Sequence, residues 1–195
     1  MRVKEGNKEK DILEAAIKIF AEDGYHNAKI SKIADTARVA TGSVYVYFKN
    51  KEDILQKIFE DLWEKLFNEL NSLSTNKNLS PIEKIDSMID LVFDVFTENS
   101  NLAIVFVNEQ NNLQRAEEIR FQNFYEKFLD LGEAAINQGI TDGVFSDTFD
   151  IKVFRIFILG ALRSLLQIWA HNPKELPLNK IRQSVKYLIK NGIQK

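Results

Sequence analysis

Hydroxyl, ammonium and aromatic side chains follow one another closely between residues 45 and 51. Tyr45 and Tyr47 are followed by Lys49 and Lys51. Tyrosine hydroxyls and lysine ammonium groups donate hydrogen bonds to phosphate oxygens, and the free amides of a helix beginning near residues 50–53 attract the same anions. This order of groups predicts contacts with a phosphate backbone, although interleaved aromatic and basic residues also occur simply as core and solvated surface.

A helix-turn-helix pattern contains these tyrosines. Residues 30–47 predict two short helices joined by a tight turn, in which the small side chains of Ala34 and Ala37 let the helices pack closely at a steep angle. The start of the second helix, with Thr41 and Ser43, is then free to enter a major groove, where short polar side chains reach bases and phosphates. We also expect the Thr41 hydroxyl to cap this helix.

Catalysis and metal binding find little support in the sequence. It has no cysteine, and its two histidines, His26 and His171, are far apart. They lack the spacing that would put two imidazoles on one helical face. Asp86, Asp90 and Asp94 are interpreted as a solvated stripe, since no nucleophile has a base beside it. We therefore expect neither an enzyme nor a cofactor or metal site.

The charge balance divides the 195-residue chain into a basic and an acidic part. Residues 1–51 have 10 basic and 7 acidic side chains, and residues 52–195 have 16 and 21. A basic first module is compatible with an anionic partner, although a solvated surface would account for the same excess. The polar N-terminus and the lack of 18 consecutive uncharged apolar residues predict a cytoplasmic protein with no membrane partner.

Long helices are expected, because the chain has only 8 glycines and 3 prolines. Ser80, Pro81 and Glu83 predict a capping box, and Asp150 is expected to cap another helix. Residues 102–107 are apolar throughout and fit either a strand or a buried helix, and residues 108–112, including Glu109, are expected to form a polar connector. Beyond the helix-turn-helix, apolar stripes predict helices over about residues 8–23, 55–73, 81–96, 121–139, 154–169 and 178–189.

The segment G-S-V-Y-V-Y-F-K-N-K-E-D-I-L, from Gly42 to Leu55, together with E-D-G-Y, from Glu22 to Tyr25, resembles the Tet repressor family of bacterial transcription regulators. The resemblance implies an all-α fold of about nine helices. In this fold a three-helix DNA-binding domain, here residues 1–50, precedes a larger ligand-binding and dimerisation domain, here residues 51–195.

The resemblance also assigns roles by position. Tyr45 and Tyr47 would contact phosphates, Lys51 would contact the backbone, and Thr41, Ser43 and Val46 would face bases, Val46 against a thymine methyl. The full set expected at DNA is Ser31, Lys32, Arg38, Thr41, Gly42, Ser43, Tyr45, Val46, Tyr47, Lys49 and Lys51.

The chain departs from the family pattern at two places. Ala28 and Lys29 stand where hydroxyl residues commonly begin the second helix, and Arg38 stands where the turn usually has glycine. If Arg38 is left-handed, it costs about 1 kcal/mol relative to glycine, a cost that its charge could offset by reaching DNA.

Bulky apolar residues are concentrated in the second part, where 11 of the 14 phenylalanines follow residue 60. They fit either a large aromatic core or an apolar cavity. Scattered segments at Gly24–His26, Ser31–Ala34, Asn101–Val105 and Gly139–Gly143 resemble the fatty-acid-metabolism regulators of the family, which implies release from DNA by a long-chain acyl-coenzyme A. The expected lining is Val92, Phe96, Phe106, Phe124, Phe128, Phe157 and Leu162, and the cations available to its head group are Arg115, Arg120, Lys127, Arg155 and Arg163.

A symmetric homodimer is expected, because residues 154–169 are apolar on more sides than one chain can cover. Two reading heads would require a pseudo-palindromic operator. The residues expected at the dimer interface are Phe154, Ala161, Leu165, Trp169, Val185 and Leu188. Two alternatives stay open: a related regulator of a drug-like ligand that controls efflux, and a helical protein-binding adaptor without DNA binding.

Overall fold

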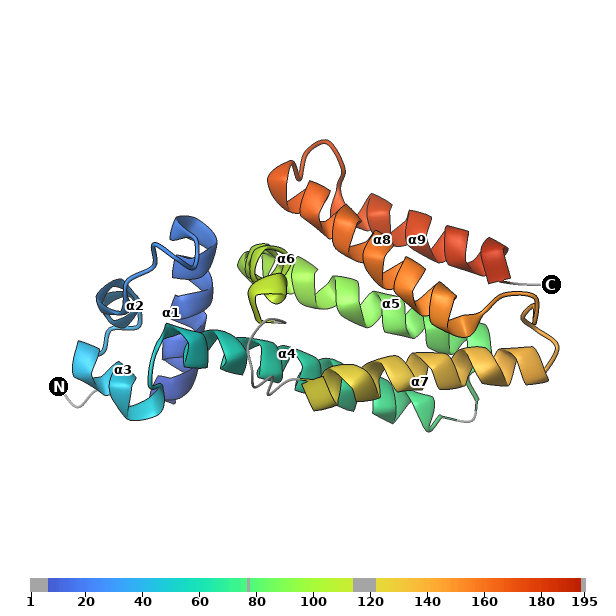
Figure 1. The fold of residues 1–195 in the computed structure, drawn as a ribbon, viewed down its shortest axis with the longest axis horizontal. Coiled ribbons are helices and arrows are strands. Elements are labelled where there is room, and N and C mark those ends of the chain that lie inside the picture. Colours follow the sequence, from blue (N-terminus) through green and yellow to red (C-terminus); the bar gives the residue numbers. More distant parts are fainter. Residues whose placement is uncertain (1–6, 77, 114–121, 194–195) are drawn as a thin grey trace. The chain divides into compact units, whose positions relative to one another are not determined.

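The computed structural model describes residues 7–76, 78–113 and 122–193, and within these ranges the chain is all-α, as predicted (Figure 1). The helices are α1 (Lys8–Asp23), α2 (Ile30–Thr36), α3 (Thr41–Tyr47), α4 (Lys51–Ser74), α5 (Pro81–Glu98), α6 (Ser100–Leu113), α7 (Gln122–Thr141), α8 (Ile151–His171) and α9 (Leu178–Ile193).

The chain forms two compact units, which we call the first and the second unit. The first unit comprises residues 1–62 and 100–121, and the second comprises residues 63–99 and 122–195. The first unit therefore contains α1, α2, α3, the beginning of α4, and α6. The second contains the remainder of α4 with α5, α7, α8 and α9.

Local sequence signals account for most helix ends. α1 ends before Gly24, which adopts a positive φ of 76° that glycine tolerates. The predicted capping box forms at α5, where Ser80 accepts from the Glu83 amide and the Glu83 carboxylate accepts from the Ser80 amide. The predicted cap of Asp150 on α8 forms as well. The expected cap of Thr41 is wrong: α3 begins at Thr41 itself, after Ala40, with no side-chain cap.

The ambiguous run at residues 102–107 is helical and lies within α6. Ala103, Val105 and Val107 are buried, because α6 packs against α1 in the first unit. The polar connector expected at residues 108–112 is wrong, since α6 continues through it to Leu113. Glu109 is buried instead of lying in a polar loop. Packing against α1 thus overrides the weak helix propensity of the Asn residues in this segment.

The core of the first unit forms where the apolar face of α1 meets α2, α3 and α6. Ile12, Ala16 and Ile19 on α1 are almost completely buried, as are Ile33 and Ala34 on α2. A small residue at position 34 permits the close approach of the helices that the sequence predicted. This packing determines which face of the helix-turn-helix remains in solvent.

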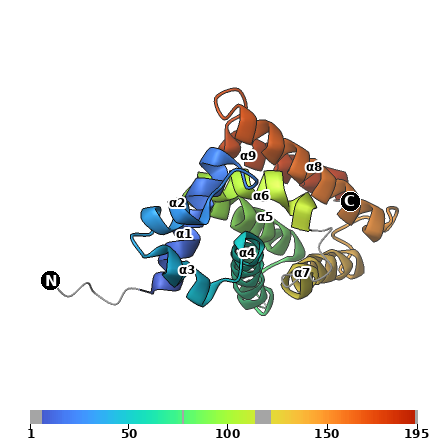
Figure 2. The same cartoon turned by 60° about the vertical axis from the view of Figure 1, so that its left-hand side comes forward.

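In the second unit α5 packs against α7 and α9, and α8 packs against α7 and α9. Figures 1 and 2 both show α8 and α9 side by side. Asp94 is exposed and Asp90 half-buried, so the expected solvated stripe is found in part, but both carboxylates also have basic partners. Asp90 pairs with Lys186 at 2.6 Å, and Arg182 pairs with Asp94, so these carboxylates connect α5 to α9. The sequence could not indicate this, because the partners are about 90 residues away.

Candidate functional site

The turn between α2 and α3 has the hydrogen bonds of a Schellman motif. The Val39 amide donates to the Ala34 carbonyl at 3.0 Å, and the Arg38 amide donates to the Asp35 carbonyl at 3.1 Å. Arg38 has a φ of 58°, so its backbone is left-handed. The sequence alone had not determined whether it would be. The turn places α3 directly after α2, in the order that a helix-turn-helix requires.

α3 is amphipathic over only seven residues. Val44 is fully buried and anchors the helix on the first unit, whereas Tyr45 is 57% and Val46 79% exposed. Thr41, Gly42 and Tyr47 are also exposed, and Ser43 is half-buried. Large apolar and aromatic groups at such exposure leave a face that is available for a partner. It holds both the groups expected at bases and those expected at phosphates.

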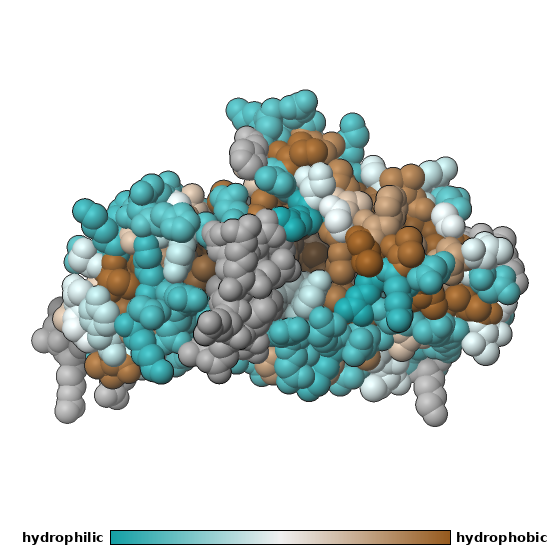
Figure 3. Space-filling view, in the orientation of Figure 1, coloured by the Kyte–Doolittle hydropathy of each residue, from teal (hydrophilic) through white to brown (hydrophobic). Residues whose placement is uncertain are grey.

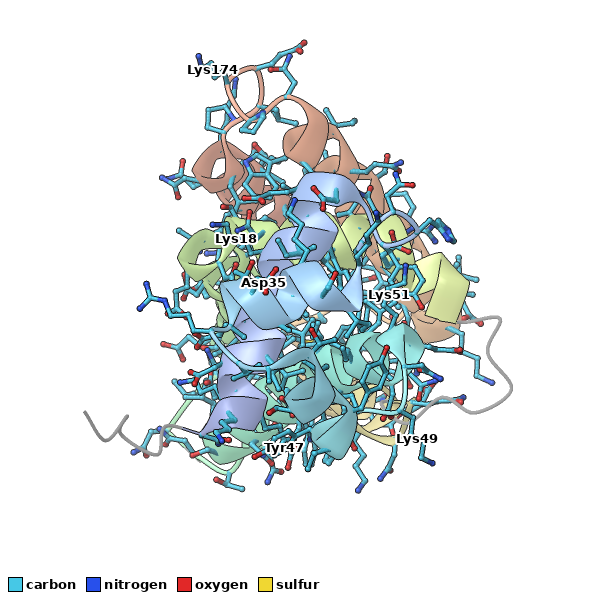
Figure 4. All side chains as sticks on the ribbon, turned by 90° about the vertical axis from the view of Figure 1, so that its left-hand side faces the viewer. Lys18, Asp35, Tyr47, Lys49, Lys51 and Lys174 are labelled. Atoms are coloured by element: carbon cyan, nitrogen blue, oxygen red, sulfur yellow. The ribbon has the colours of Figure 1, made fainter. Side chains whose placement is uncertain are left out.

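The segment from α3 to α4 is held by a reciprocal cap. The Asp53 amide donates to Asn50 Oδ1 at 2.8 Å, and the Lys49 amide donates to Asp53 Oδ2 at 3.0 Å. Lys49 itself is exposed. In Figure 4, Tyr47 and Lys49 lie along the lower edge of the view, with Lys51 well above them. The cap therefore fixes the backbone of this segment. It uses the amide of Lys49 and not the ammonium of its side chain.

Lys51 has a structural role that the sequence did not predict. Its ammonium donates to the Tyr25 and His26 carbonyl oxygens, the latter at 2.9 Å, and lies 4.8 Å from the Tyr25 ring centroid. It thus ties the start of α4 to the segment between α1 and α2. An ammonium has three donors, so one N–H is left for a phosphate.

The other expected contacts on α2 differ in their surroundings. Ser31 is exposed at the beginning of the helix. Lys32 is exposed but pairs with Asp23 at 2.8 Å, so its charge is already balanced within the chain. Ala28, where a hydroxyl would be usual, is buried and packs in the core. Among the expected contacts, those on α3 are therefore more available than Lys32.

Burial raises the pKa of Tyr25, and the negative charges of Glu52 and Glu109 raise it further. These two carboxylates come from α4 and α6, and Tyr25 follows α1. Two helices of the first unit thus bring a carboxylate near this tyrosine. The pKa of this phenol therefore lies further above neutral pH than that of an ordinary tyrosine.

The residues expected to line a ligand cavity do not all lie together. Phe96 and Phe128 are buried in the second unit, and Val92, Phe124 and Leu162 are half-buried there. The prediction for Phe157 is wrong, because this side chain is 68% exposed on α8.

Phe106 belongs to the first unit, where its ring stacks on Phe59 of α4 at 5.6 Å. Sequence reasoning missed the aromatic partners that α4 and α7 supply in the second unit. Trp63 lies 4.8 Å from Tyr125 and 5.6 Å from Phe128, measured between ring centroids. Trp63 lies four residues after Phe59, a helical spacing that could have indicated it.

Most of the expected head-group cations that the structure describes have partners. Arg155 donates to Glu126 and Glu133 of α7, at 2.6 and 2.7 Å. Its partial burial opposes a raised pKa, but the two carboxylates outweigh it, and the pKa of Arg155 is raised. Lys127 lies over the rings of Phe67 and Phe124, at 5.7 and 5.9 Å. Arg115 and Arg120 lie outside the described residues.

α8 has an exposed apolar face, which we call the α8 face: Val153, Ile156, Phe157 and Ile168. Their spacing of three, four and eleven residues puts them on one side of the helix. Figure 3 shows brown, apolar surface over this part of the second unit. On α9, Tyr187 and Leu188 are exposed too, each at 67%.

The expected dimer residues agree only in part with this surface. Leu188 is exposed, and Phe154, Ala161 and Leu165 are half-buried. The predictions for Trp169 and Val185 are wrong, because these side chains are 8% and 7% exposed and pack inside the second unit. Because α8 is apolar on nearly all sides, its sequence could not show which face is buried and which is exposed.

Comparison with known proteins places these features in context. Residues 12–58 match the family described as bacterial regulatory proteins, tetR family, and residues 59–192 match the C-terminal region of YsiA-like protein. The chain is 32% identical to the fatty acid metabolism regulator protein of Bacillus subtilis over 93% of each chain.

Two solved structures are similar over nearly the whole chain. The transcriptional regulator FadR from Bacillus subtilis, in complex with stearoyl-CoA, has a TM-score of 0.80 and 30% identity and covers 95% of this chain and 99% of its own. The fatty acid degradation regulator FadR from Bacillus halodurans has a TM-score of 0.81 and 29% identity, and covers 96% of both chains.

Proposed function

Because the chain belongs to the Tet repressor family of bacterial regulatory proteins, we propose that it represses transcription and leaves its operator when an acyl-CoA binds. The observation that supports DNA binding is the exposure of Tyr45 and Val46 on a helix that Val44 anchors. In this proposal residues 1–50 are the DNA-binding domain, and residues 51–195 bind the effector and dimerise.

The proposed DNA contacts divide by chemistry. Tyr45, Tyr47 and Lys49 bind phosphates, which position α3 without reading sequence. Thr41, Ser43 and Val46 face base edges, and the Val46 methyls meet a thymine methyl. Gly42 lies between Thr41 and Ser43. Apart from its neighbours in the chain and the backbone of its own helix, no described atom lies within 4 Å of where its Cβ would be, so this position leaves room for DNA to approach the backbone closely.

Mutation separates the two kinds of contact. Tyr45→Phe should weaken binding to operator and random duplexes by the same factor, whereas Ser43→Ala should change the preferred base at one position of the half-site. Both effects can be measured by fluorescence anisotropy with genomic fragments and a randomised library. If no genomic fragment is bound better than random DNA, the chain is not a sequence-specific repressor, and the alternative of a protein-binding adaptor is favoured.

The acyl-CoA proposal is supported by the Bacillus subtilis structure, whose description includes stearoyl-CoA. A long acyl chain gains about 0.8 kcal/mol for each methylene that is buried, so an apolar interior can supply most of the affinity. Release requires that the ligand bind better to the conformation that does not fit DNA, and a coupling of about 2–3 kcal/mol would weaken operator binding roughly 30-fold to 150-fold.

Titration of the protein–operator complex with C12 to C18 acyl-CoA esters tests this proposal. Free coenzyme A serves as a control for the head group, and an apolar drug-like compound tests the alternative of efflux control. Leu162→Trp should abolish release, because the larger side chain would narrow the proposed ligand cavity. It should leave operator binding unchanged, because Leu162 is half-buried on α8, away from α3 in sequence. No release by any ester would refute the acyl-CoA assignment but not the repressor assignment.

A homodimer is proposed on the exposed α8 face together with Tyr187 and Leu188. α8 is also the one helix of the described residues that is long and apolar enough to cross a membrane. Arg155, near the start of α8, is paired with acidic residues of α7, and such a charged pair favours a protein partner. Two copies would read half-sites about 34–36 Å apart or slightly more, on a pseudo-palindromic operator in the cytoplasm.

A further inference from the structure

The turn of the helix-turn-helix contains the only non-glycine residue with a positive φ among the described residues. Arg38 follows α2 at the position of the Schellman motif that is usually glycine, because glycine has no Cβ to clash in the left-handed region. A left-handed arginine strains the backbone. Such strain persists where the surrounding structure enforces it, and it concentrates at functional sites.

The backbone hydrogen bonds of the Schellman motif hold this conformation, but no side-chain contact of Arg38 with the described residues offsets the strain. The Arg38 side chain is exposed, and its guanidinium has neither a hydrogen bond nor an ion pair with any described residue. Asp35 lies only three residues earlier, yet it forms no ion pair with Arg38. By contrast, Lys32 pairs with Asp23, and Lys51 binds two backbone carbonyls. Arg38 is thus a cation whose charge is not balanced inside the first unit.

The position of the turn indicates what the guanidinium meets. In a helix-turn-helix the first helix crosses the phosphate backbone and the second enters the major groove, so the turn joins the two regions. Arg38 precedes Thr41, the first residue of α3, by three residues. A guanidinium binds phosphate oxygens with two parallel N–H donors, and its charge is present at every physiological pH.

We propose that Arg38 binds a phosphate of the operator backbone, and that the chain gives up folding stability for this contact. This inference rests on the proposed repressor function. It adds a DNA contact at position 38, where glycine would give the more stable fold. Each dimer then has two such contacts. Because they are made to phosphates, they strengthen binding to every sequence equally and add to its salt dependence.

Two substitutions separate strain from contact. Arg38→Gly removes both, so it should raise the urea midpoint of unfolding while weakening operator binding about tenfold. Arg38→Ala removes the contact but keeps a Cβ in the left-handed region, so it should weaken binding as much without raising the midpoint. In both variants the slope of log K against log salt should become shallower by about 0.9 for each copy, or about 1.8 for the dimer.

Lys190→Ala is the matched control, because it removes one exposed positive charge from α9 in the second unit. It should leave both the affinity and the salt slope at the wild-type values. Wild-type affinity and slope in Arg38→Gly and Arg38→Ala would overturn the inference, as would an altered base preference instead of a uniform loss. Failure of the wild-type protein to bind any duplex would instead refute the proposed repressor function.

Discussion

Truncating Phe157 tests whether the α8 face joins two copies of the chain. The residue is 68% exposed in one chain. Complete burial of a phenylalanine is worth about 1.5–3 kcal/mol, so covering the exposed two thirds is worth about 1–2 kcal/mol. Each side chain occurs twice in a symmetric interface. Phe157→Ala should therefore cost about 2–4 kcal/mol and raise the dimer dissociation constant roughly 30-fold to 1000-fold.

Sedimentation equilibrium from nanomolar to micromolar protein measures this dissociation constant directly. At concentrations where the variant is monomeric, its operator binding should also become steeper in protein concentration, because two chains must then associate on DNA. Far-ultraviolet circular dichroism should be unchanged, since Phe157 is not part of the core of the second unit.

Val46→Ala is the matched control, because it truncates an exposed apolar side chain on α3. It should leave the dissociation constant at the wild-type value and affect only DNA binding. If Phe157→Ala dimerises as tightly as the wild-type protein, the α8 face is not the interface.

Three further substitutions test the fold. Gly139→Ala should destabilise the second unit by more than 1 kcal/mol in urea unfolding, because its methyl group would overlap the buried ring of Phe145. Ser80→Ala should cost about 1 kcal/mol at neutral pH. Hydrogen bonds from Ser80 lower the pKa of Glu83, so the part of the cap made by the Glu83 carboxylate stabilises the fold above the ordinary pKa of 4.5. The wild-type advantage should shrink as the pH falls through the lowered pKa, and the bond to the Glu83 amide should remain. Lys51→Met should lower the urea midpoint by removing two bonds to backbone carbonyls, and an unchanged midpoint would contradict the structural role of this ammonium.

Hydrophobic periodicity and capping residues were enough to predict a helix and its limits wherever the helix has one apolar and one polar face. The limits of α1, the capping box at Ser80 and the cap at Asp150 were all predictable from short-range signals. The exposure of Tyr45 and Val46 was predictable too, because Val44 is the only position of α3 that must face the core. The family resemblance rests on this same local segment.

The tertiary structure decided the matters in which distant residues compete. α6 continues through its Asn residues because it packs on α1, and Asp90 and Asp94 meet basic residues of α9 that are remote in sequence. Lys51 was expected at DNA but also holds the Tyr25 carbonyl, which only the folded chain brings within reach.

The sequence by itself determined that the chain is all-α and where the short helices of the helix-turn-helix lie, and it predicted that α8 needs burial beyond one chain. It could not determine which side of α8 is outside, because that helix is apolar on nearly every side and periodicity then has no polar face to mark. Packing against α7 and α9 resolves this by burying Trp169 and leaving Phe157 in solvent. The backbone of Arg38 was likewise decided only when α2 and α3 closed around their turn, because the hydrogen bonds that hold it left-handed form in the folded motif.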